Sequence, residues 1–339
     1  LSVLASLAPT EIVWKPEVVL PFHPNGMLFE GLKGDEVVDS WTIYSVGGGA
    51  LANEASRLET PRSIYPLSTI SEIKEWCYHE GKTFWEYVSD CEGPEIWDYL
   101  DTVWETMCAT IQRGLNNDGV LPGGLKVARK ASTYWVKSKS YTDSLSSRAK
   151  IYAYALATSE ENASGGTVVT APTCGSSGVM PAVLYHLSTS RNFLRIRILR
   201  ALATAGLFGN VAKTNSSISG AEVGCQGEVG VACAMAAAAA CQLFGGTPSQ
   251  IEYAAEMGLE HHLGLTCDPV CGLVQVPCIE RNAIAAARAF DANAYATLSD
   301  GSHMVSFDKV VEVMNETGHA LPSLYRETSE GGLAKRFKR

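Results

Sequence analysis

The segment VGVACAMAAAAACQLFGGTPSQ, residues 229–250, decides the fold class of this chain. Its apolar run from Val229 to Phe244 is about 16 residues long and mostly alanine, which is short for a membrane span of about 20 residues. Two glycines end the run, and Thr247 followed by Pro248 is the start signal of another helix. The segment therefore predicts a buried helix followed at once by a second one.

Helical spacing continues on both sides of this segment. Apolar residues recur at intervals of three and four after Ser71, and almost no strand-like alternation follows residue 140. Helices are predicted within residues 71–88 and 94–115 and over residues 143–161, 178–190, 193–209, 227–244, 248–259, 279–293 and 306–317. The pattern predicts a large all-helical domain over residues 71–339.

Residues 1–60 have a different character. β-branched and aromatic residues mix with turn residues at 11–32 and 35–51, which is typical of strands. The motif YSVGGG at residues 44–49 indicates a strand that ends in a glycine-rich turn. Prolines and polar residues predict a linker at residues 61–70. The predicted architecture is mainly α, with a small strand-rich piece before the helical domain.

Composition excludes some classes of function. The net charge is −9 and the only locally basic segment is AKRFKR at residues 334–339, so no nucleic-acid partner is expected. The opening LSVLASLAPT lacks the basic region of a secretory signal. Ten cysteines without such a signal favour metal binding or catalysis over a disulfide scaffold, and a cytoplasmic location. Because the first residue is leucine, we expect a fragment or a processed chain.

Three cysteines lie where thiolates are stabilised. Cys225, Cys267 and Cys278 occur in glycine- or proline-containing segments at predicted helix edges, where free backbone N–H groups stabilise thiolates. Three such turns could hold an iron–sulfur cluster with one iron left open. The alternative is that all are ordinary buried residues, as cysteine often is. Cys233 and Cys241, inside the alanine run, fit that alternative well.

Other interpretations of the cysteines stay open. A zinc site could form from Cys267, Cys271, Cys278 and either His261 or His262, although the spacing matches no standard zinc pattern. We interpret Cys77, Cys91 and Cys108 as buried structural residues of predicted helices.

Two loops carry polar side chains suited to a substrate. TAPTCGSSGVMPAV, residues 170–183, is a turn before a helix that could cradle a carboxylate or phosphate, with Ser176 and Ser177 as donors. FHPNGM, residues 22–27, places His23 in a turn where it could titrate near neutrality, or where it is simply a surface histidine. LEHHLGLTCDP places His261 and His262 at a predicted helix end, where a cation is favourable for the helix dipole. In SDGSHMVSFD, Ser302 and His303 precede a predicted helix and are either capping residues or site residues.

Seven segments, taken in order, resemble those of the iron–sulfur-dependent L-serine dehydratases: HPNGM, YSVGGG, TAPTCGSSGVMPAV, SISGAEVGCQGEVG, GLTCDPVCGLVQVPCIERNA, DGSH…SFDKV and YRETSEGGLA. They extend from residue 23 to residue 334, nearly the whole chain. The resemblance implies conversion of L-serine to pyruvate and ammonia by a homodimer without pyridoxal phosphate. It implies an all-helical catalytic domain preceded by the C-terminal part of a small α+β domain.

The same resemblance implies roles for individual residues. A [4Fe–4S] cluster would be bound by Cys225, Cys267 and Cys278, and its open iron would take the substrate. His23 would be the base that removes the α-proton, and Ser45 and Thr173 would bind the polar groups of the substrate. Ser176 and Ser177 remain further donors to the carboxylate. Cys271 is not expected to be a ligand, because many relatives carry glycine there.

Two departures from the family pattern keep other functions open. A serine- and histidine-containing motif that relatives carry upstream is absent, and the chain lacks the C-terminal cysteine that caps the open iron in many relatives. An inactive cluster-binding fragment is therefore one alternative. A related lyase acting on L-cysteine or L-threonine is another, because pocket size cannot be deduced from sequence.

Overall fold

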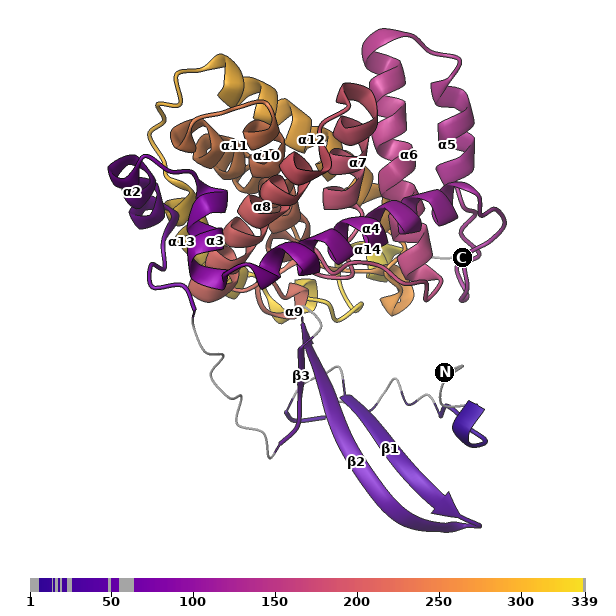
Figure 1. Ribbon diagram of the computed structural model, residues 1–339. Coiled ribbons are helices and arrows are strands. Elements are labelled where there is room, and N and C mark those ends of the chain that lie inside the picture. The colour runs from indigo at the N-terminus through magenta and orange to yellow at the C-terminus, as the bar shows by residue number, and fades with distance from the viewer. Residues whose placement is uncertain are drawn as a thin grey trace. The chain divides into compact units, whose positions relative to one another are not determined.

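The computed structural model describes residues 6–13, 15, 18, 20–22, 26–47, 50–54 and 64–337 (Figure 1). The chain divides into two compact units, Leu1–Pro61 and Arg62–Arg339. The larger unit is helical and the smaller one carries a three-stranded sheet, so the predicted mainly α fold is confirmed.

The sheet of the smaller unit is antiparallel, in the order β1-β2-β3, with strands β1 (Gly26–Lys33), β2 (Glu36–Gly47) and β3 (Ala50–Ala52). β1 and β2 form a hairpin around Gly34, whose φ of 63° suits glycine. The described residues between Glu11 and Leu20 form no strand, although the sequence predicts one there. Prolines at positions 16 and 21 lack the N–H group that a strand ladder needs.

The larger unit follows the predicted helices closely. Its elements are α2 (Ile70–Glu80), α3 (Phe84–Glu92), α4 (Glu95–Leu115), α5 (Ala131–Ser138), α6 (Asp143–Ala163), α7 (Val179–Arg191), α8 (Arg195–Asn215), α9 (Gly220–Val223), the π-helix η1 (Gln226–Gly230), α10 (Val231–Leu243), α11 (Pro248–Glu260), the 3₁₀ helix η2 (Val270–Gly272), α12 (Cys278–Leu298), α13 (Phe307–Ala320), the 3₁₀ helix η3 (Ser323–Tyr325) and α14 (Gly332–Arg336). The short helix α5 has no counterpart among the predictions.

The alanine-rich helix α10 is the core of this unit. It is buried along almost its whole length and packs against α7, α8, α11 and α12 (Figure 1). Small residues permit this close approach: a Cβ on Gly258 of α11 would lie 2.8 Å from the Cα of Ala234. Thr247 caps α11 by accepting from the Gln250 N–H at 3.3 Å, with Pro248 next, as predicted. Within the described residues, no helix has the length and apolar character needed to cross a membrane.

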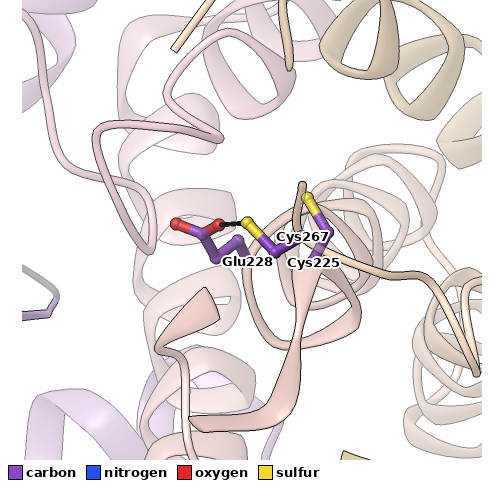
Figure 2. Close-up of side chains that lie close together, drawn as sticks. All are labelled: Cys225, Glu228 and Cys267. Carbon is purple, nitrogen blue, oxygen red and sulfur yellow. Dashed lines mark hydrogen bonds between the residues drawn. The ribbon is translucent and has the colours of Figure 1, made fainter. Parts of the chain in front are cut away.

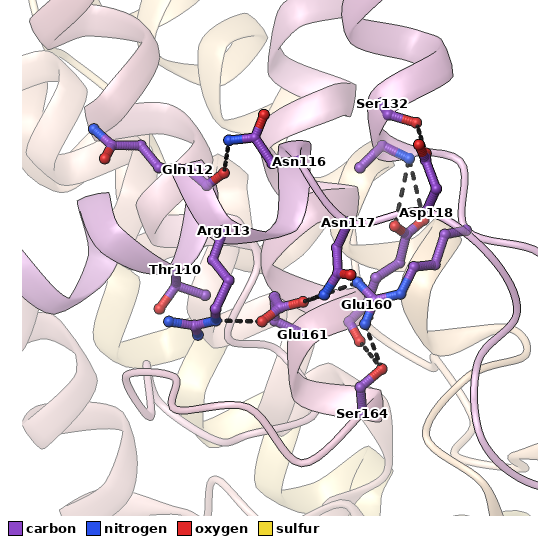
Figure 3. A network of polar contacts seen from close by, with 12 residues as sticks. Thr110, Gln112, Arg113, Asn116, Asn117, Asp118, Ser132, Glu160, Glu161 and Ser164 are labelled. Carbon is purple, nitrogen blue, oxygen red and sulfur yellow. Dashed lines mark hydrogen bonds and ion pairs between the residues drawn. The ribbon is translucent and has the colours of Figure 1, made fainter.

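A network of charged side chains joins α4, α6 and the segment before α5 (Figure 3). Glu161 of α6 is nearly fully buried and accepts from Arg113 of α4 and, at 2.9 Å each, from Asn117 and Arg129. Arg113 also donates to the carbonyl oxygen of Thr167 at 2.7 Å. The network therefore anchors the loop that follows α6.

The folded state should lose stability in acid, in part because of His186 of α7. This side chain is buried, its Nε2 lies 2.9 Å from the Ser147 hydroxyl and its Nδ1 has no partner among the described residues. Burial lowers the pKa of His186 to about 4, against about 6.5 when unfolded. The neutral ring is favoured by the fold, so its contribution is complete above pH 6.5 and is lost as the pH falls towards 4. We expect this histidine alone to reduce the free energy of unfolding by about 3 kcal/mol over that interval.

A His186→Phe variant tests this expectation, because phenylalanine keeps an aromatic ring against Phe290 but cannot titrate. Urea unfolding between pH 4 and 7 should show that the free energy of unfolding of the variant depends less steeply on pH than that of the original chain. The difference in slope should correspond to about one proton. His79→Gln is the control, because His79 is 85% exposed in its side chain and should leave the dependence unchanged. An equally steep loss of stability in His186→Phe contradicts the assignment.

Candidate functional site

Two of the predicted cysteine ligands meet in the helical unit. The sulfur atoms of Cys225 and Cys267 and a carboxylate oxygen of Glu228 all lie within 4.8 Å of one another (Figure 2). Cys225 and Cys267 are only 2% and 3% exposed. Among the described residues, this is the only group of three or more His, Cys, Asp or Glu side chains with the spacing of metal ligands.

Local backbone geometry places Cys225 and Glu228. Gly224, just before the cysteine, has a φ of 75°, and a Cβ there would lie 2.8 Å from the carbonyl oxygen of Leu265. The chain then enters the π-helix η1, in which Glu228 lies three residues after Cys225. The Cys225 sulfur atom and a Glu228 carboxylate oxygen thereby come within 4.8 Å of each other. Single π-turns of this kind are frequent at functional sites.

The backbone of Cys267 is held on both sides by the C-terminal segment. Its N–H donates to the Tyr325 carbonyl at 2.8 Å, and its carbonyl accepts from the Glu327 N–H at 2.6 Å. The next residue, Asp268, accepts from the Leu333 N–H at 2.5 Å. The position of this cysteine therefore depends on residues late in the chain.

The third predicted ligand, Cys278, is buried at the first position of α12, directly after Pro277. It lies outside the group of three defined above. One turn further along α12, Arg281 donates to the Thr266 carbonyl at 2.6 Å and lies 3.7 Å from an Asp268 oxygen. Arg281 thus connects the helix of Cys278 to the loop of Cys267.

The thiols and the carboxyl group influence one another's ionisation. Donation by the Cys267 thiol and the positive charge of Arg281 lower the pKa of Cys225 to about 7, against the opposing effect of burial. The same interaction, together with burial, raises the pKa of Cys267. Burial, followed by the charge of Cys225, raises the pKa of Glu228 to about 8 and also raises the pKa of Cys278. The pair therefore shares its ionisation unequally, with the pKa of Cys225 lowered and that of Cys267 raised.

The glycine- and serine-rich loop reaches the same place. Thr173 donates its hydroxyl hydrogen to Glu228 Oε1 at 2.9 Å, and Ser176 Oγ lies 3.0 Å from Thr173 Oγ1. Ser177 Oγ is buried and has no hydrogen-bond partner among the described residues. Asn282 of α12 fixes the loop, because its Oδ1 accepts from the Gly178 N–H at 2.9 Å. Hydroxyl groups are thus placed beside the cysteines, as a polar substrate requires.

Two predicted site residues lie in the smaller unit. Ser45 is on β2, opposite Leu51 of β3. His23 lies outside the described residues.

Glu228 belongs to the metal-like group, and sequence reasoning missed it. The signal was its spacing of three residues from Cys225. The structure does not bring the residues of the alternative zinc site together: Cys271 is exposed, His262 Nδ1 is 2.7 Å from the Gly258 carbonyl, and neither belongs to the metal-like group. Cys233 and Cys241 are fully buried in α10, as expected of core residues.

Comparison with known proteins gives a consistent result. The family model described as the serine dehydratase alpha chain matches residues 45–334, and that of the serine dehydratase beta chain matches residues 4–56. L-serine dehydratase 1 of Escherichia coli K12 is 47% identical over 332 residues, covering 93% of this chain and 72% of that protein. L-serine dehydratase of Streptomyces coelicolor is 46% identical over 330 residues, with the same two coverages. L-serine dehydratase of Mycobacterium tuberculosis is 42% identical over 346 residues, 97% of this chain and 75% of that protein.

Proposed function

The chain belongs to the serine dehydratase family, and we propose on that premise that it converts L-serine to pyruvate and ammonia. The observation that carries the proposal is the convergence of Cys225, Cys267 and Glu228 beside the Thr173 hydroxyl. A buried thiol pair next to hydroxyl donors suits a metal group and a small polar substrate together.

We propose that Cys225, Cys267 and Cys278 hold a [4Fe–4S] cluster. The donor set fits: two of the sulfur atoms are within 4.8 Å of each other, the third is buried at a helix start, and the pKa of Cys225 is lowered by its neighbours. When bound, such a cluster supplies Lewis-acid stabilisation for an oxygen that leaves with its electron pair. Arg281 keeps two of the cysteine-bearing segments together through Thr266 and Asp268.

The remaining roles belong to the chain's own polar groups. Thr173, Ser176 and Ser177 are proposed to donate to the carboxylate of L-serine, and Ser45 to bind a further polar group. His23 is proposed to take the α-proton through its imidazole as the β-hydroxyl group leaves as water. The resulting aminoacrylate tautomerises to the imine, and hydrolysis returns one water and releases pyruvate and ammonia.

The proposal extends to organisation and location. We assign residues 1–60 to the beta-type domain, residues 61–70 to a linker and residues 71–339 to the alpha-type catalytic domain. We propose a homodimer, by analogy with the family. A cytoplasmic location is proposed because all ten cysteines are free, which suits a reducing compartment.

Anaerobic reconstitution of the chain with ferrous iron and sulfide tests the function. We expect pyruvate and ammonia to appear in equal amounts from L-serine, with slower release of product from L-threonine and of sulfide from L-cysteine. Chain treated identically but without iron is the control and should be inactive. A chain that carries iron and sulfide yet releases no pyruvate contradicts the proposed activity, and faster turnover of L-cysteine or L-threonine contradicts the substrate.

A further inference from the structure

A cavity lies between α11, α12 and the loop that precedes α13. Its volume is about 740 Å³, within the range of small-molecule sites. His261, Ser302 and His303 are on its walls, so two histidine-containing segments that the proposed function leaves unused meet here. None of the residues proposed to bind the cluster or L-serine lines this cavity.

Glu256 borders the cavity with a carboxyl group that lacks a counter-charge. The residue is 96% buried, because only 4% of its surface is exposed. Within residues 64–337 it forms no ion pair, and its polar neighbour is the carboxyl group of Glu260, one turn later. The contrast is Glu252, one turn earlier, which is buried but paired with Lys74. A buried carboxyl group is costly unless a cation or donors face it.

The other charged groups around the cavity already have partners. Asp291 forms an ion pair with Arg148 at 3.0 Å. Arg288 donates to the His261 carbonyl oxygen at 2.7 Å. Glu260, which is half exposed, lies 3.7 Å from Nδ1 of His261. Glu256 is therefore the carboxyl group of the cavity without a cationic partner among the described residues. Acidic side chains also outnumber the single arginine on the walls, which favours a positively charged ligand.

The wall beside these carboxyl groups is aromatic. Tyr253 stacks on His303 with centroids 4.6 Å apart and an interplanar angle of 5°, and Tyr295 meets Tyr253 edge-on at 6.0 Å. We call Tyr253, Tyr295 and His303 the aromatic wall. Aromatic faces attract cations and also pack against alkyl groups.

The spacing of the side chains argues against a bare metal ion. Among the described residues, the Cys225 group alone brings three metal-ligating atoms within 4.8 Å of one another. The carboxyl groups and histidines of the cavity are too far apart for that, so a ligand must extend between its walls.

We propose that this cavity binds a primary alkylammonium ion, with its N–H groups towards Glu256 and Glu260 and its alkyl chain against the aromatic wall. Two carboxylates match the several N–H donors of a primary ammonium group. Burial, then the charges of Glu260 and Glu252, raise the pKa of Glu256 to about 7. A bound cation would replace the proton that otherwise neutralises this pair.

Binding of n-butylammonium chloride to the full chain at neutral pH tests the proposal, by calorimetry and by saturation-transfer NMR. We expect saturable binding that Glu256→Gln weakens about tenfold, because a neutral amide replaces the charge acceptor. Tyr295→Leu should weaken it about threefold by removing part of the aromatic wall; this residue is 62% exposed, so the fold is spared. Glu312→Gln, at an exposed ion pair with Lys309, is the control and should bind normally.

Three probes decide the class of ligand. Tetramethylammonium, which has no N–H group, should bind about tenfold more weakly than n-butylammonium. Potassium and magnesium chloride should not displace n-butylammonium beyond the effect of ionic strength. The proposal is overturned if n-butylammonium does not bind, or if Glu256→Gln and Tyr295→Leu bind it as tightly as the original chain does. It is also overturned if magnesium displaces n-butylammonium at a lower concentration than ionic strength alone requires.

Discussion

Replacement of Cys267 by serine should remove the cluster and with it the release of pyruvate. The sulfur atom of Cys267 lies within 4.8 Å of that of Cys225, whereas its backbone is held independently by Tyr325 and Glu327. Serine keeps both backbone hydrogen bonds and changes the ligand atom alone. The expected loss of activity exceeds the roughly 10- to 100-fold that follows loss of a residue that merely orients a ligand.

Iron and sulfide content per chain after anaerobic reconstitution is the direct measurement, together with visible absorbance. Cys241→Ser is the matched control, because this cysteine is fully buried in α10 and lies 3.8 Å from the Thr297 hydroxyl, which serine can also contact. The control should bind iron normally. If Cys267→Ser binds as much iron and sulfide as Cys241→Ser, the ligand assignment is wrong even if activity falls.

Replacement of Glu161 by alanine should be among the most destabilising single changes in the helical unit. Burial opposes ionisation of this side chain, but donation from Asn117, Arg113 and Arg129 lowers its pKa overall. Without the carboxylate, the Arg129 side chain, which is 6% exposed, would be a buried charge without its partner. Breaking a buried pair in this way costs about 3–5 kcal/mol.

Urea unfolding followed by circular dichroism measures this cost through the helical signal. Glu312→Ala, which breaks the exposed ion pair with Lys309, is the control and should cost less than about 1 kcal/mol. Similar losses for the two variants would show that the network in Figure 3 contributes no more than a surface pair.

The helices of the larger unit could be predicted because their signals are local. The start of α11 at Thr247-Pro248 and the start of α12 after Pro277 are set by capping and proline geometry within a few residues. The alanine run has no polar face, so its sequence alone indicates that this helix is buried at the centre of the unit. By contrast, α5 is short and buries only Ala131 and Ser138, so its sequence carries little periodicity.

The candidate site could be predicted as a set of motifs but not as an arrangement. Thr173, Glu228 and Cys267 lie on three separate segments, and the hydrogen bonds that join them depend on how helices pack. The resemblance supplied the cysteines and the loop hydroxyl, whereas Glu228, within a glycine- and valine-rich stretch, resembles a solvated charge. In the folded chain Glu228 is instead half-buried, and its carboxyl group faces Thr173 and Cys267.

The two hydrogen bonds that hold Cys267 set an order of events during biosynthesis. A nascent chain on the ribosome exposes Cys225, Cys267 and Cys278 well before Tyr325 and Glu327 have been translated. Until those late residues arrive, the loop of Cys267 has no partner for its backbone, and its sulfur atom is not fixed opposite Cys225. The proposed delivery of iron to these cysteines should therefore follow translation of residues 325–327 instead of accompanying elongation past Cys278.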